Sequence, residues 1–206
     1  MSIKLEKPLY YNNEFALRFE LGPSDVGLWI NRDKQIINEE YFRVAFQRAL
    51  SIFNSAFIAS DEIKICYQMF SDGRQKIRKG DYFFELMNDL MSKKIEFSEH
   101  RDIYSEDLER KRYCWKRVTI SNLTTSELDV EKTIEALINT DFGVRGTNLR
   151  GELYIINCTK GLVFHIYDDR GMDIASESKG TLVPIYHEQQ KLLLSYDKEN
   201  MDSLFS

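Results

Sequence analysis

Cysteine, histidine and proline are scarce in this chain of 206 residues, which contains three of each. Cys66, Cys114 and Cys158 lie far apart and form no CxxC pair, so the sequence predicts neither a disulfide framework nor a zinc site. Each cysteine stands among strand-forming residues. We therefore expect buried, reduced thiols in a cytoplasmic protein.

Long apolar runs are also missing. No window approaches 18 uninterrupted apolar residues, which excludes a membrane-spanning helix of ordinary length. The first ten residues carry Lys4, Glu6 and Lys7 and no apolar core, so they do not resemble a signal peptide. We expect no association with a membrane.

Positive charge is in deficit, because the net charge is −5. An acidic chain of this kind disfavours nucleic acid and favours a basic protein partner. The opposite interpretation depends on residues 110–117, where basic side chains alternate with Tyr113 and Trp115 in a pattern that suits single-stranded nucleic acid. Because the whole chain is acidic, a strand with solvated basic ends is the favoured explanation of this pattern.

Recognisable catalytic motifs are absent from the sequence. It contains no GxSxG elbow, P-loop lysine or dinucleotide fingerprint, and Asp141-Phe142-Gly143 echoes a kinase triplet without the accompanying kinase motifs. No cofactor is expected from these patterns, and the sequence favours a protein without catalytic activity while leaving the question open.

The apolar periodicity, in contrast, is clear over much of the chain. Alternation with a period of two predicts strands, and spacings of three and four predict helices. The predicted strands cover residues 15–21, 63–67, 113–120, 153–156, 162–167 and 172–175. The predicted helices cover residues 38–58, 126–142 and 182–196. The pattern is less clear in between, where residues 82–91 are a candidate short helix and residues 94–103 are either a polar strand or an irregular excursion.

These elements mix without a regular strand–helix–strand rhythm, which favours an α+β fold. We expect a mainly antiparallel sheet packed against a long N-terminal helix, a central helix and a C-terminal helix. The length suits a single domain over residues 1–206. A subdivision near residues 74–112 is the alternative, because the pattern is weakest there.

An acidic turn between two predicted strands is the first candidate binding site. Asp168 and Asp169 would form an exposed pair at the hairpin edge, with Arg170 and Asp173 beside them and Tyr167 as an aromatic anchor. Such a surface suits the arginines of a basic partner. The alternative is a turn held by ion pairs, in which Asp starts the turn and the following glycine adopts a positive φ.

The same acids support a second hypothesis from another functional class. Glu152, Asp168, Asp169 and Asp173 would supply oxygen ligands for a divalent cation that activates water, as in a hydrolase or nuclease. Their spacing is not that of an EF-hand. The protein-interaction hypothesis is therefore favoured over the metal-dependent one.

A glycine-rich loop over residues 143–148 is a further candidate. Its backbone N–H groups would face an anion, with Arg145 as the charged binding residue. The competing interpretation is structural, with Gly143 ending the preceding helix in the left-handed conformation.

Six short segments of the chain resemble a bacterial family known as the domain of unknown function 3885. They are LRFELG (17–22), FNSAF (53–57), SDE (60–62), FGVRGTN (142–148), GELYIIN (151–157) and YDDRGMD (167–173). This resemblance implies no particular activity. The order of hairpin, acidic turn, strand and closing helix over residues 153–194 is also similar to Smi1-like immunity proteins, which implies the binding and neutralisation of a toxin.

Overall fold

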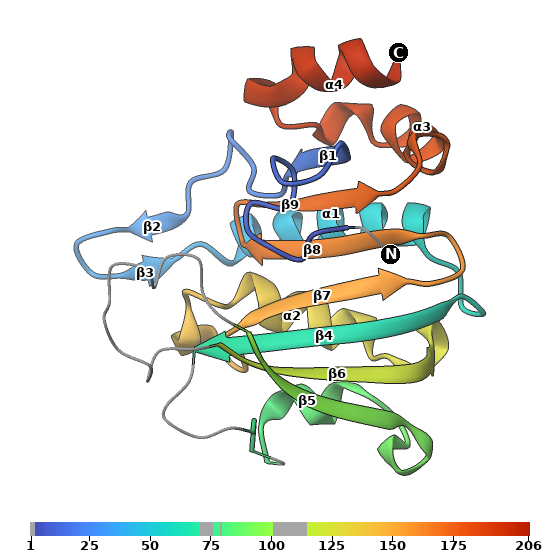
Figure 1. Cartoon of the computed structure of the whole chain (residues 1–206). Helices are drawn as coiled ribbons and strands as arrows, with labels where there is room; N and C mark the ends of the chain where they lie inside the picture. Colours follow the sequence, from blue (N-terminus) through green and yellow to red (C-terminus); the bar gives the residue numbers. More distant parts are fainter. Residues whose placement is uncertain (1–2, 71–75, 79, 101–114) are drawn as a thin grey trace, which may run out of the picture.

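A large antiparallel sheet dominates the computed structural model, which describes residues 3–70, 76–78, 80–100 and 115–206 (Figure 1). Within these residues its strand order is β1-β9-β8-β7-β4-β6-β5. The strands are β1 (Phe15–Glu20), β4 (Glu62–Phe70), β5 (Lys94–His100), β6 (Trp115–Thr124), β7 (Glu152–Asn157), β8 (Leu162–Asp168) and β9 (Gly171–Ser176).

The helices and a small separate hairpin complete the described fold. The hairpin pairs β2 (Trp29–Asn31) with β3 (Ile36–Ile37), and the helices are α1 (Glu39–Ala56), α2 (Val130–Ile138), α3 (Lys179–Glu188) and α4 (Lys198–Phe205). The predicted α+β class, with a mainly antiparallel sheet and helices packed on it, is confirmed.

The long helix α1 forms where the apolar spacing predicted it. The side chain of Asn38 caps its N-terminus by accepting a hydrogen bond from the backbone N–H of Glu40 at 3.2 Å. Glu39 and Glu40 lie in the first turn, where negative charge is favourable. The opposite side of the helix is buried from Phe42 to Ala56, so burial of this face holds α1 against the sheet.

The two faces of the sheet are covered in different ways (Figure 1). Helices α1 and α2 pack behind the sheet and enclose the main hydrophobic core. On the other face, the N-terminal segment over residues 3–14 crosses in front of β8 and β9, and Leu9 is fully buried in a second, smaller core.

The edge strand β1 is closed by the C-terminal part of the chain. The backbone N–H of Leu194 donates to the carbonyl of Arg18 at 2.9 Å, and Leu193 forms an isolated bridge with Phe19. An exposed edge strand is a template for unwanted pairing, so this contact protects the sheet on that side.

Several predicted boundaries were wrong for local reasons. Helix α2 begins at Val130, because residues 125–127 form a 3-10 turn that Thr124 and Glu127 stabilise as a capping box. The C-terminal helix ends at Glu188, and α4 was not predicted. Gly143 does not end α2 in the left-handed conformation, since Asn139 ends that helix.

The cysteine prediction was partly wrong, because Cys66 is buried but Cys158 is exposed. Cys114, most of the basic run over residues 110–117 and the end of the candidate strand at residues 101–103 lie outside the described residues. The candidate subdivision near residues 74–112 also falls partly there and stays a prediction. No helix in the described ranges is both long and apolar enough to cross a membrane.

Candidate functional site

The acidic turn between β8 and β9 is ordered by its own side chains and is not the exposed acid pair expected from the sequence. Asp168 and Asp169 are only 5% and 4% exposed. Asp168 accepts from the backbone N–H of Arg170 at 2.8 Å and forms an ion pair with its guanidinium. The predicted exposure of the two acids was therefore wrong, whereas the Arg170 side chain is 73% exposed.

Gly171 is required here for a reason other than the positive φ that the turn pattern predicted. Its φ is not in the left-handed region. A Cβ atom would instead lie 2.1 Å from the hydroxyl of Tyr167 and 2.7 Å from the carbonyl oxygen of Phe19. Only glycine lets β1 and the Tyr167 ring approach this point.

Asp169 connects the turn to the first turn of α1. It accepts a hydrogen bond from the hydroxyl of Tyr41 at 3.0 Å. Burial raises the pKa of the Asp169 carboxyl, and the tyrosine hydroxyl opposes this shift by stabilising the charged form. Tyr41 was not singled out from the sequence, where it looks like an ordinary core residue of the helix.

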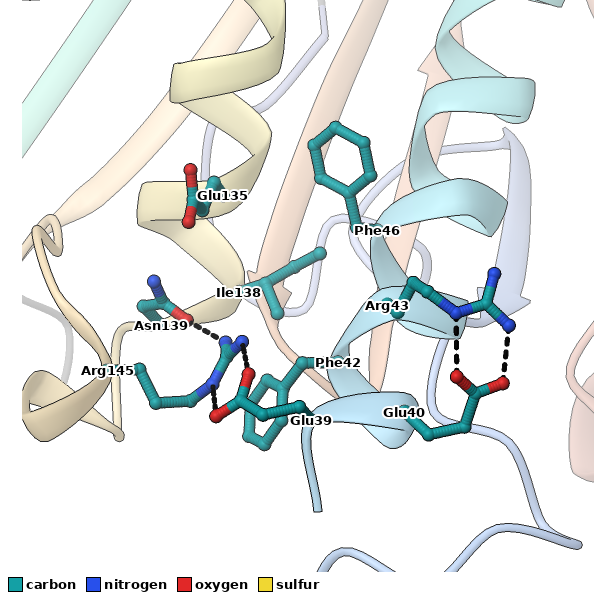
Figure 2. Close-up of a pocket in the computed structure, with 9 residues that line it drawn as sticks. All are labelled: Glu39, Glu40, Phe42, Arg43, Phe46, Glu135, Ile138, Asn139 and Arg145. Atoms are coloured by element: carbon teal, nitrogen blue, oxygen red, sulfur yellow. Dashed lines mark hydrogen bonds and ion pairs between the residues drawn. The ribbon is translucent and has the colours of Figure 1, made fainter. Parts of the chain in front are cut away.

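Arg145, the candidate from the glycine-rich loop, lies against the same turn of α1 (Figure 2). Its guanidinium carbon is 3.8 Å from the centroid of the Phe42 ring, which is the geometry of a cation–π contact. The two terminal nitrogens donate to Glu39 and Asn139, each at 2.5 Å. The predicted acidic turn and glycine-rich loop therefore meet at one end of α1.

Exposed apolar residues follow, along the chain, two of the aromatic residues that pack at this meeting point. The rings of Trp29 and Phe42 both contact the ring of Phe142, with centroids 6.1 and 5.0 Å apart. Beside Trp29 and Phe142 in the chain, Ile30 and Val144 are 69% and 88% exposed. We call this region the helix-start surface and define it by Ile30, Ile36, Glu39, Val144, Arg145 and Arg170.

A groove between α1 and α2 opens beside the helix-start surface, with a volume of about 430 Å³ (Figure 2). Phe42, Phe46 and Ile138 supply its apolar lining, and the carboxylates of Glu39 and Glu135 lie along it. Most of the residues that line this groove are charged or polar, so it suits a ligand that carries both a charge and an apolar part.

Comparison with known proteins assigns the chain to a family. A family model described as "Domain of unknown function (DUF3885)" matches residues 2–197. The chain belongs to this family. It is similar to "Uncharacterized protein YnaE" of Bacillus subtilis (strain 168), with 22% identity over 211 residues that cover 95% of this chain and 93% of the relative. No solved structure matches the chain.

In this member of the DUF3885 family, Tyr167 and Asp173 lie on the other face of the sheet, away from the helix-start surface. Asp173 is fully buried and faces Arg18 across β9 and β1, with Asp173 Oδ1 and Arg18 Nε 3.2 Å apart. The guanidinium carbon of Arg18 is 5.4 Å from the centroid of the Tyr167 ring. Burial raises the pKa of the Asp173 carboxyl to about 6.

His165 on β8 belongs to the same buried group of side chains as Asp173. It pairs with Asp173 in the strand register, is fully buried, and lies with its Nδ1 2.9 Å from the carbonyl oxygen of Leu153. Its ring stacks on Tyr154 at 4.3 Å. Burial lowers the pKa of His165 to about 4, so the imidazole is neutral at ordinary pH.

The carboxylates of the metal hypothesis are engaged separately. Glu152 accepts from Gln68 at 2.7 Å and from Tyr154 at 2.9 Å, while the three aspartates bond to different partners as described above. Within the described ranges, no three His, Cys, Asp or Glu side chains are grouped to hold a metal ion. The predicted ligand set is therefore not brought together.

Proposed function

We propose that this member of the DUF3885 family is a non-catalytic protein-interaction domain and that it binds its partner through the helix-start surface. The observation that carries the proposal is the exposure of Ile30 and Val144, which follow members of a packed aromatic cluster in the chain. Exposed apolar side chains surrounded by charged ones mark protein interfaces.

The predicted binding residues have two different roles in this proposal. Arg170, whose side chain is 73% exposed, contacts the partner directly, because arginine is frequent at interfaces. Arg145, whose side chain is only 14% exposed, borders that contact. Asp168 orients Arg170, and Asp169 holds the turn against Tyr41. Tyr167 and Asp173 have no part in this surface and stabilise the opposite face.

The proposed partner is a basic, toxin-like protein, which the domain would neutralise in the manner of an immunity protein. The net charge of −5 supports this class, because opposite charge accelerates association and suppresses wrong partners. At the surface itself, Glu39 is 71% exposed, and Asp141 is exposed as well.

The test is capture of partners from native host lysate with the full chain and the double variant Ile30→Asp/Val144→Asp. The matched control is Met91→Asp, since Met91 is 97% exposed and lies outside the helix-start surface. We expect the wild type and the control to retain one dominant protein that the double variant loses, with all three melting alike. Equal retention by the double variant would refute this surface.

The immunity role has its own test. The captured partner is expressed in the host, where we expect it to arrest growth and the wild-type domain to relieve the arrest. A partner that leaves growth unchanged would rule out the immunity role and leave the interaction role in place.

A further inference from the structure

The groove between α1 and α2 already contains one bound cation, and this cation comes from the chain itself. The Arg145 side chain is 14% exposed and lies between the Phe42 ring and two oxygen acceptors, Glu39 and Asn139 (Figure 2). An aromatic face together with a carboxylate and an amide oxygen is a typical environment for a guanidinium. One half of the groove therefore shows which chemical group its walls can hold.

The other half has similar chemistry without the cation. Phe46 and Ile138 line it, and the carboxylate of Glu135 lies on the α2 side (Figure 2). Glu135 is exposed, and within the described part of the chain no cation pairs with its carboxylate. The nearby Arg43 is engaged elsewhere, because its guanidinium bonds to Glu40 and Gln47.

We propose that this second half of the groove binds an arginine side chain from the partner protein. The aliphatic part of the arginine would lie on the half-buried Phe46, at the margin of the nearly fully buried Ile138, and its guanidinium would pair with Glu135. This inference rests on the proposed function, because it names the group by which the partner enters the surface. An arginine anchor also fits the basic partner that the charge of the chain favours.

Charge complementarity and shape together support this occupant. A carboxylate alone at a surface attracts any cation weakly and gives little specificity. Here the carboxylate borders an apolar, partly buried floor, which suits the long stem of arginine. The intrachain Arg145 shows that a guanidinium packs over an aromatic ring in this environment, whereas an ammonium group lacks the planar shape of a guanidinium.

The direct test is an NMR titration of the labelled full-length protein with N-acetyl-argininamide. The matched probe is N-acetyl-citrullinamide, which has nearly the same shape and no charge. We expect saturable shifts at Phe46, Glu135 and Ile138 with the arginine probe, with a Kd of about 1–10 mM for a single side chain. No localised shift in the groove, or an equal response to citrulline, would overturn the inference.

Two variants then test whether the carboxylate of Glu135 binds the arginine probe. We expect Glu135→Gln to weaken binding of the arginine probe about three- to tenfold. Glu131→Gln is the control, because Glu131 is an exposed acid on the same helix outside this groove. Binding that is unchanged in Glu135→Gln, or weakened equally in both variants, would also overturn the site.

The same variant separates this inference from the proposed function. If Ile30→Asp/Val144→Asp loses the captured partner and Glu135→Gln retains it fully, the interaction function stands and the arginine site is refuted. If Glu135→Gln loses the partner and Glu131→Gln retains it, both are supported. Retention by the double variant refutes the proposed surface, and the titration still decides whether the groove holds a guanidinium.

Discussion

Two arginines of this chain have similar neighbours and opposite surroundings. Arg145 lies over Phe42 and pairs with Glu39, a side chain that is 71% exposed. Arg18 lies 5.0 Å from the Tyr11 ring centroid and pairs with Asp173 and Asp197, whose side chains are 0% and 2% exposed. Each site combines an aromatic ring, an arginine side chain that is 14% exposed and a carboxylate, but only the carboxylate of the first site is open to water.

The difference determines what each arginine can do. Water replaces a lost partner at the exposed site, so its contacts can be exchanged for those of another protein at small cost. At the buried site, removal of one partner leaves a charge in a medium that solvates it poorly. The buried site therefore fixes the fold, and the exposed site remains available for binding.

The largest effect should come from breaking the buried site. We expect Arg18→Ala to lower the free energy of unfolding at pH 7 by about 3–5 kcal/mol, because it leaves Asp173 buried and unpaired. Urea denaturation measures this loss. Arg43→Ala is the control, since Arg43 pairs with Glu40 at the surface and should cost at most about 1 kcal/mol. Similar losses for both variants would contradict the comparison.

The second prediction concerns pH and the same buried group of side chains. The folded state binds a proton on Asp173 at about pH 6, above the ordinary value of 3.8, so acidification from pH 6 to 4 stabilises the fold through Asp173. His165 has an ordinary pKa of 6.5, which applies to the unfolded state, but a pKa of about 4 in the folded state. The same acidification therefore destabilises the fold through His165. Each effect is on the order of 3 kcal/mol, and they oppose each other.

Two single variants should separate the opposing contributions of Asp173 and His165 to the pH dependence of stability. We expect Asp173→Asn to lose stability, relative to the wild type, as the pH falls from 7 to 4.5. His165→Asn should gain relative stability over the same range. Urea denaturation at several pH values measures both differences. Parallel curves of unfolding free energy against pH for the wild type and both variants would show that Asp173 and His165 do not titrate in this way.

A third prediction tests the close approach of strands beneath Tyr167. We expect Gly171→Ala to lower stability by about 1–3 kcal/mol, because the new methyl group overlaps the Tyr167 hydroxyl and the Phe19 backbone. Gly180→Ala is the control within α3, where the nearest atom to the added Cβ is 3.6 Å away. That control should be neutral or stabilising by up to about 1 kcal/mol, because alanine favours helix.

The smallest effect is expected at the exposed site. Arg145→Ala should cost about 1–2 kcal/mol of stability, because it removes a cation–π contact, an ion pair with the exposed Glu39 and a hydrogen bond to the buried Asn139. Thermal melting in low and high salt measures it, and the difference from wild type should shrink as salt screens the pair with Glu39. A loss above about 3 kcal/mol would mean that this site is structural like the one around Arg18.

The sequence predicted the elements of this fold better than the environment of its site. The period-two and period-three-to-four patterns located β1 and α1 to within two residues, since a buried face leaves a regular trace. The same alternation placed Arg18 on the polar face of its strand, where solvent would be expected. Residues 3–14 cover that face, and such an irregular segment has no periodicity to predict its position.

The candidate site was also only half predictable. Turn-forming residues identified the acidic turn and the glycine-rich loop, because both depend on local chemistry. The turn and the loop meet at α1 through contacts with Tyr41 and Phe42. In the sequence these two residues cannot be distinguished from the other apolar residues of the helix. The hairpin of β2 and β3 escaped prediction because strands of three and two residues are too short to show a period.

The pairing of β1 with β9 also determines when the sheet can be completed during synthesis. Phe15 pairs with Ser176, so the first strand of the sheet made by the ribosome pairs with the last. At ordinary elongation rates, roughly 10–30 s separate the two. During this interval Leu17 and Phe19, both fully buried in the finished protein, have no strand to join. The newly made N-terminal part therefore exposes these apolar side chains until β9 has been synthesised.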